Sequence, residues 1–85
     1  MALEIQFTAT ARKYFDSLDK PTRSRVAEKL RAIAEDPRDA RLSKPLIGTD
    51  KRSARIGPYR VLFVINERFL TVVEIGPRGQ IYRKL

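Results

Sequence analysis

Two runs of strand-forming residues in the second half of the chain constrain its fold more than any other feature. Residues 59–65 read YRVLFVI, residues 69–75 read FLTVVEI, and only Asn66-Glu67-Arg68 separates them. Two such runs joined by a short polar reversal are typical of a β-hairpin. Because apolar residues occupy both parities of each run, both strands should be central strands that are partly covered on two sides.

The first half of the sequence predicts one strand followed by a helix. Leu3, Ile5 and Phe7 alternate with polar residues, which is the pattern of a short strand. Thr8 or Thr10 can then cap a helix, because a threonine side chain accepts a hydrogen bond from the first helical amides. The apolar positions of that helix recur at helical spacing, at Ala11, Tyr14, Phe15 and Leu18.

A second helix is predicted directly after the first. Asp19 followed by Pro21 is a helix start, since aspartate caps the free amides and proline fits the first turn. Pro37 disfavours helical geometry in the residue before it, so this helix should end near Asp36. Its apolar stripe consists of Val26, Leu30 and Ile33, with Ala27 and Ala34 beside them. The two helices are expected to form a helical hairpin with little room between its arms.

The remaining segments complete the predicted order of elements. Residues 37–50 are interpreted as a connecting loop, Ser53–Ile56 as a strand, Gly57-Pro58 and Gly76-Pro77 as bends, and residues 80–83 as a last short strand. The order is then β-α-α-β-β-β-β. We expect one α+β domain over residues 1–85, with the helical hairpin packed on a small, mostly antiparallel sheet of four to five strands.

Charge is concentrated in the second half. Residues 41–85 hold ten basic and three acidic side chains, whereas residues 1–40 hold eight and seven. Arginine outnumbers lysine twelve to six, which favours forked contacts with phosphate. A phosphate-bearing or nucleic-acid partner is therefore expected, although a basic half can also be a solvated surface.

The sequence lacks the residues that several kinds of catalysis and metal binding require. The sequence contains no histidine and no cysteine, so imidazole acid–base catalysis, nucleophilic triads and thiolate zinc sites are excluded. The acidic residues of the second half stand far apart, which argues against a two-metal phosphodiesterase, and we predict no cofactor or metal. The sequence shows no signal peptide or membrane span, and we expect a cytoplasmic protein.

Strand parity predicts which cations meet. Lys51, Ser53 and Arg55 share one parity, and Arg60 has the parity opposite to Val61 and Phe63. If the helices cover the face that bears Val61 and Phe63, the cations of the other face can converge on one concave surface. Those cations are Lys51, Arg55, Arg60 and Arg78, and Tyr82 joins them. Such a set can stabilise the charge of a pentacovalent phosphate, while RNA supplies its own 2′-hydroxyl nucleophile. The alternative is that Tyr82 is a strand residue and the arginines are solvated.

The motifs of the second half resemble those of the RelE/ParE toxin superfamily. They are Arg55-x-Gly57-x-Tyr59-Arg60-Val-Leu-Phe, Ile75-Gly76-Pro77-Arg78 and Ile81-Tyr82, and the resemblance extends to the helical hairpin. It implies a RelE-like toxin of a type II toxin–antitoxin system that cleaves mRNA, typically in the ribosomal A site.

The resemblance also implies roles for individual residues. Arg60 and Arg78 would stabilise the scissile phosphate, and Tyr82 would stack on or orient the nucleotide. Lys51 would help to activate the 2′-hydroxyl, whereas the second basic position of the family falls on Ser53. The remaining predicted RNA-binding residues are Arg52, Arg55, Arg83 and Lys84.

Two alternative functions remain. The ParE-like branch of the superfamily inhibits DNA gyrase, and the protein can also be a homologue that binds RNA without cleaving it. Arg78 together with Tyr82 favours the RelE side. The implied partners are a cognate antitoxin, the ribosome and mRNA, with no membrane and with DNA bound only through the antitoxin. Leu42, Leu46 and Ile47 are candidates for an apolar antitoxin contact, or are loop residues tucked onto the core.

Overall fold

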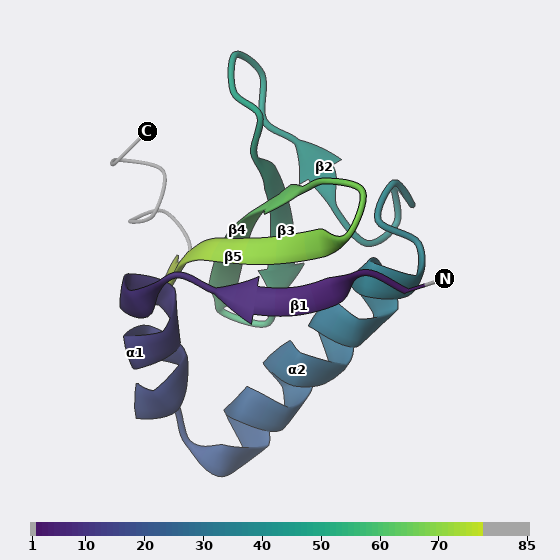
Figure 1. Ribbon diagram of the computed structural model, residues 1–85. Helices are drawn as coiled ribbons and strands as arrows, with labels where there is room; N and C mark the ends of the chain where they lie inside the picture. The colour runs from purple at the N-terminus through teal and green to yellow at the C-terminus, as the bar shows by residue number, and fades with distance from the viewer. Residues whose placement is uncertain (1, 78–85) are drawn as a thin grey trace.

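The computed structural model describes residues 2–77 and contains two helices on one face of a mixed β-sheet (Figure 1). The chain runs through β1 (Glu4–Phe7), α1 (Ala9–Ser17), α2 (Lys20–Glu35), β2 (Lys44–Pro45), β3 (Arg52–Ile56), β4 (Tyr59–Ile65) and β5 (Phe69–Pro77). The sheet order is β1-β5-β4-β3-β2, in which β1 runs parallel to β5 and the other neighbours are antiparallel. The predicted α+β class and mostly antiparallel sheet are confirmed.

The helix boundaries follow the capping residues. The Thr8 hydroxyl accepts a hydrogen bond from the Ala11 amide and begins α1, and the Asp19 carboxylate does the same for Thr22 at the start of α2. Asp36 ends α2 immediately before Pro37, as expected. The two helices diverge from their connection at Leu18 and Asp19 (Figure 1), so they form a hairpin whose arms are splayed rather than close together.

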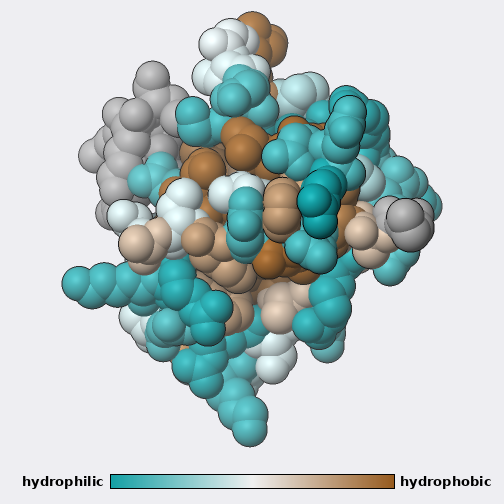
Figure 2. All heavy atoms as spheres, viewed as in Figure 1, coloured by the Kyte–Doolittle hydropathy of each residue, from teal (hydrophilic) through white to brown (hydrophobic). Residues whose placement is uncertain are grey.

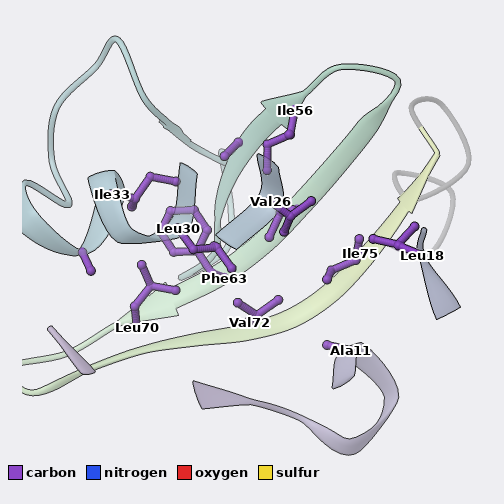
Figure 3. Close-up of a cluster of buried hydrophobic side chains, with 13 residues drawn as sticks. Ala11, Leu18, Val26, Leu30, Ile33, Ile56, Phe63, Leu70, Val72 and Ile75 are labelled. Atoms are coloured by element: carbon purple, nitrogen blue, oxygen red, sulfur yellow. The ribbon is translucent and has the colours of Figure 1, made fainter. Parts of the chain in front are cut away.

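The hydrophobic core lies between the helices and the sheet. The side chains of Leu30, Phe63 and Val26 belong to the cluster of buried side chains that forms this core (Figure 3). All three are inaccessible to solvent or nearly so. Val61, Phe63, Leu70 and Val72 point into this core, and we call this side of the sheet the core face. The two predicted hairpin strands, β4 and β5, are interior strands of the sheet, as their apolar composition required.

Three features of the sheet differ from the sequence-based expectations. Residues 37–50 are not only a loop, because Lys44 and Pro45 pair with Ser53 and Arg52 to form the edge strand β2. Proline is tolerated there, since an edge strand has one side without a partner. The prediction of a bend at Gly76-Pro77 is wrong, because β5 continues through Pro77. Its last two residues pair with Arg60 and Tyr59 at the start of β4.

The third difference is a β-bulge between β4 and β5. Phe63 pairs with Val72 but Leu62 pairs with Glu74, so Val73 is an additional residue in β5. The bulge changes the parity of the strand, which allows Val72 and Ile75 to point into the same core. The predicted strand at residues 80–83 lies outside the described residues. Neither helix in the described part of the chain is long and apolar enough to span a membrane.

Candidate nucleic-acid interface

Two arginines lie directly opposite each other on the face of the sheet that is turned away from the helices. Arg55 of β3 pairs with Arg60 of β4, and Ser53 pairs with Leu62 two residues further along. We call the side that bears these residues the outer face. Two guanidinium groups on neighbouring strands add to the positive potential of this surface, which attracts anions. The predicted parity of Arg55 and Arg60 is confirmed.

A cleft of about 410 Å³ opens beside this pair, between the outer face and the segment that connects α2 to β3. Its walls come from three places in the chain: α2, residues 40–46, and the strands β3 and β4. The lining residues are Lys29, Ala40, Arg41, Leu42, Ser43, Lys44, Pro45, Leu46, Ser53, Arg55 and Arg60. We call it the basic cleft, because five of these described residues are cationic and none is acidic.

The core holds Arg60 in a fixed place in the basic cleft. Its neighbours Val61 and Tyr59 pack on the core side, so the backbone of β4 cannot shift without disturbing the core. The Nε atom of Arg60 is itself buried. Arg55 is exposed on the neighbouring strand and forms the solvent-facing side of the pair. An anion that enters the cleft therefore meets one arginine that is held by packing and a second that can adjust.

Arg52 and Lys51 lie elsewhere. The side chain of Arg52 reaches Ser43, with 3.0 Å from its Nε to the Ser43 Oγ and 3.3 Å from an Nη to the Ser43 carbonyl oxygen. Lys51 precedes β3; its amide donates to the Thr49 Oγ1 and its carbonyl accepts from the Leu46 amide. Neither side chain lines the basic cleft. Their assignment to RNA contacts and catalysis stays a prediction.

Four of the predicted site residues, Arg78, Tyr82, Arg83 and Lys84, lie outside the described residues. The site that the structure describes is therefore the part formed by β3, β4 and residues 40–46. In this part, no group of three or more His, Cys, Asp or Glu side chains is arranged to hold a metal ion.

Three cations of the basic cleft were not among the predicted site residues: Lys29, Arg41 and Lys44. Arg41 and Lys44 lie in the segment that was interpreted as a connecting loop. Lys29 lies on α2, for which only the apolar residues that face the core were considered. One signal was present, because a lysine next to a proline is typical of an edge strand that lies beside the rest of the sheet.

Asp39 orients Arg41 at the rim of the cleft. The carboxylate accepts hydrogen bonds from the Arg41 Nε at 3.1 Å and from an Arg41 Nη at 2.7 Å. These bonds, together with one from the Arg41 amide, lower the pKa of Asp39 to about 2. The carboxylate is therefore ionised at neutral pH, and the guanidinium is held in place although its side chain is 87% exposed.

Comparison with known families identifies the chain. Residues 5–82 match the model of the ParE toxin of the type II toxin–antitoxin system parDE. The chain belongs to this family. It is therefore a toxin of a type II toxin–antitoxin system and a member of the RelE/ParE superfamily. A sequence comparison with curated proteins gave no match.

Solved structures of RelE-like proteins are similar in shape to the toxin. The chain is similar to the toxin–antitoxin complex RelBE2 from Mycobacterium tuberculosis, with 26% identity, a TM-score of 0.78, and coverage of 92% of this chain and 100% of that chain. It is similar to the isolated RelE toxin from E. coli, with 26% identity, a TM-score of 0.78 and coverage of 98% and 94%. The YoeB dimer from Staphylococcus aureus shares the fold at 22% identity and a TM-score of 0.72, with coverage of 87% and 94%. The expected RelE-like fold is confirmed.

Proposed function

We propose that this toxin is an endoribonuclease that cleaves mRNA on the ribosome and so inhibits translation. The observation that carries the proposal is the Arg55–Arg60 pair in a cleft whose charged lining, within the described chain, is entirely cationic. Such a site attracts a phosphodiester, and arginine forks match the oxygens of phosphate. The RelE-like shape of the fold supports the same function.

The proposed reaction needs little from the protein beyond positioning and charge. The RNA 2′-oxygen attacks the adjacent phosphorus, the P–O5′ bond breaks, and the products are a 2′,3′-cyclic phosphate and a 5′-hydroxyl. The 2′-hydroxyl proton is removed during the attack and a proton is delivered to the leaving 5′-oxygen. Arg60 stabilises the extra negative charge on the phosphorane, which is where a preorganised cation is most effective. Arg78 is proposed to assist at the same phosphate, Tyr82 to stack on the nucleotide, and Lys51 to help activate the 2′-hydroxyl.

In the resting cell we propose that a cognate antitoxin covers this toxin. The M. tuberculosis relative was crystallised as a toxin–antitoxin complex. On this chain, the loop between β2 and β3 carries Ile47 fully exposed, and hydrophobic atoms lie at the tip of that loop (Figure 2). Ile47 is thus the candidate apolar contact, whereas Leu42 packs against the core, which was the alternative expected for it. An acidic antitoxin segment would neutralise the basic cleft at the same time.

Primer extension on a reporter mRNA in a purified translation system tests the ribonuclease function. We expect cleavage within A-site codons with the wild type and none with Arg60→Gln. The matched control is Arg25→Gln, which removes the same charge from an exposed position on α2 and should cleave normally. Intact mRNA in the presence of folded, toxic wild-type protein would refute the proposal.

The second candidate is inhibition of DNA gyrase, and the matching ParE family model is the observation that favours it. A gyrase inhibitor should cause DNA breaks and an SOS response on expression while leaving mRNA whole. Measuring the SOS response and mRNA integrity in the same culture separates the two functions. Arg60→Gln should abolish mRNA cleavage under the first function, but need not affect DNA breaks under the second.

A further inference from the structure

One side of the basic cleft is built by residues 40–46, which we call the cleft wall, and its Lys44 lies in β2, next to β3 in the sheet. It contributes Arg41 and Lys44, and Lys29 of α2 lies beside it. These cations come from a different part of the chain from Arg55 and Arg60, so the cleft has two cationic sides. Its volume of about 410 Å³ falls in the range that accommodates a ligand larger than a single phosphate ion.

The cleft wall is held in place before any ligand arrives. Ser43, at its middle, is only 3% exposed, and the Arg52 guanidinium binds both its hydroxyl and its carbonyl oxygen. The amides of Leu42 and Ser43 donate to the Asp39 carbonyl, and Lys44 pairs with Ser53 in the sheet. A preorganised wall loses little conformational entropy when it binds, so its cations contribute more of their interaction to affinity.

Arg41 and Lys44 retain hydrogen-bond donors for a ligand. The bonds from the Arg41 Nε and one Nη to Asp39 leave the remaining Nη hydrogens of its guanidinium available. The side chain is 87% exposed, which places those donors at the rim. In the described part of the chain, no carboxylate forms an ion pair with Lys44.

We propose that the cleft wall is a second phosphate-binding position, which takes the phosphate of single-stranded RNA next to the phosphate held by Arg55 and Arg60. Two cationic sides around one nucleotide-sized space fix the path of the strand through the site. The inference rests on the proposed function, because it concerns the same cleft. It adds a second phosphate contact made by Arg41 and Lys44.

Salt-dependent binding of short RNA tests this contact. The probes are a fluorescent dinucleotide with one phosphodiester and a trinucleotide with two, both 2′-O-methylated so that they cannot be cleaved. For single strands, the slope of log K against log salt changes by about 0.7 for each phosphate contacted. With the wild type we expect the trinucleotide slope to exceed the dinucleotide slope by about that amount.

Arg41→Gln/Lys44→Gln should remove the difference between the two probes while leaving dinucleotide binding in place. The matched control, Lys13→Gln/Arg25→Gln, removes the same charge from exposed helical positions and should retain the difference. Because Arg41→Gln also breaks the pair with Asp39, thermal unfolding is measured alongside, and Lys44→Gln alone provides a variant that disturbs no ion pair in the described chain.

The outcomes separate this inference from the proposed function. A slope difference that survives in both Arg41→Gln/Lys44→Gln and Lys44→Gln overturns the second phosphate position alone. Wild-type protein that binds both probes with the same salt slope, or binds neither, overturns the second position, and the ribonuclease function is then decided by primer extension on the ribosome. If the wall variants remove the slope difference, the second position is supported. If the wild-type toxin nevertheless leaves mRNA intact on the ribosome, the ribonuclease function is overturned.

Discussion

Replacing Arg52 with methionine should destabilise the toxin, because this side chain ties the cleft wall to the sheet. Arg52 donates hydrogen bonds at 3.0 and 3.3 Å to two oxygens of Ser43, a residue that is 3% exposed. Hydrogen bonds with a charged partner contribute roughly 1.5–3 kcal/mol. Arg52 is itself only partly buried, so we expect Arg52→Met to lower the free energy of unfolding by about 2 kcal/mol, while methionine preserves most of the aliphatic packing.

Thermal unfolding followed by circular dichroism measures this effect. For a domain of this size, 1 kcal/mol corresponds to about 4–8 °C in Tm, so the expected decrease is about 8–16 °C. Arg25→Met, at an exposed position of α2, is the matched control and should change the Tm little. Ser43→Ala completes a double-mutant cycle, in which the two substitutions should couple by about 1 kcal/mol.

Two results would contradict the reasoning about Arg52. A loss below about 0.5 kcal/mol in Arg52→Met would show that the contact with Ser43 contributes little to stability. Additive effects of Arg52→Met and Ser43→Ala would show that the two residues do not act through each other. If Arg52→Met is as stable as the wild type but binds RNA more weakly, Arg52 contacts RNA directly, as its charge alone predicted.

Three further predictions concern the core, a turn and pH. Phe63→Ala should lower the free energy of unfolding by about 3–5 kcal/mol, because the ring is fully buried; a urea titration with an unchanged midpoint would be inconsistent with this. Gly57→Ala should cost about 1–2 kcal/mol from conformation alone, since Gly57 has φ +56° and an added Cβ meets no atom within 4 Å; a neutral effect in the same titration would exclude strain at this turn. The pKa of Asp39, about 2 in the folded protein, is below its ordinary value of 3.8, so its pairing stabilises the fold fully above pH 4 and this stability is lost as the pH falls towards 2. Between pH 5 and pH 2, the free energy of unfolding should depend less on pH in Asp39→Asn than in the wild type. Equal pH dependence in the two proteins would contradict the pairing.

Local sequence signals were sufficient for the helices and for the central hairpin. Thr8, Asp19 and Pro37 set helix boundaries through contacts with residues a few positions away, which is why they can be read from the sequence. The hairpin of β4 and β5 was predictable for the same reason, because a short reversal joins its strands. Strand parity also predicted that Arg55 and Arg60 share one face of the sheet, whereas their direct pairing was seen only in the structure.

The features that could not be predicted depend on partners distant in the chain or on the register of a neighbouring strand. The bulge at Val73 changes which residues of β5 face the core, and the sequence there contains no residue, such as glycine, that would indicate a bulge. The extension of β5 through Gly76 and Pro77 depends on where β4 begins. The cleft wall depends on a side-chain contact between Arg52 and Ser43, and neither residue has a pattern that reveals the other.

The parallel pairing of β1 with β5 has a consequence for the synthesis of the toxin. Ile5 pairs with Leu70, so the N-terminal strand meets its neighbour only after another 65 residues have been translated (Figure 1). Contacts this distant in the chain form late, because loop closure must come first. The sheet that supports Arg60 is therefore completed only after residues 69–72 have left the ribosome, so the strands that bear Arg55 and Arg60 lack part of their support until then.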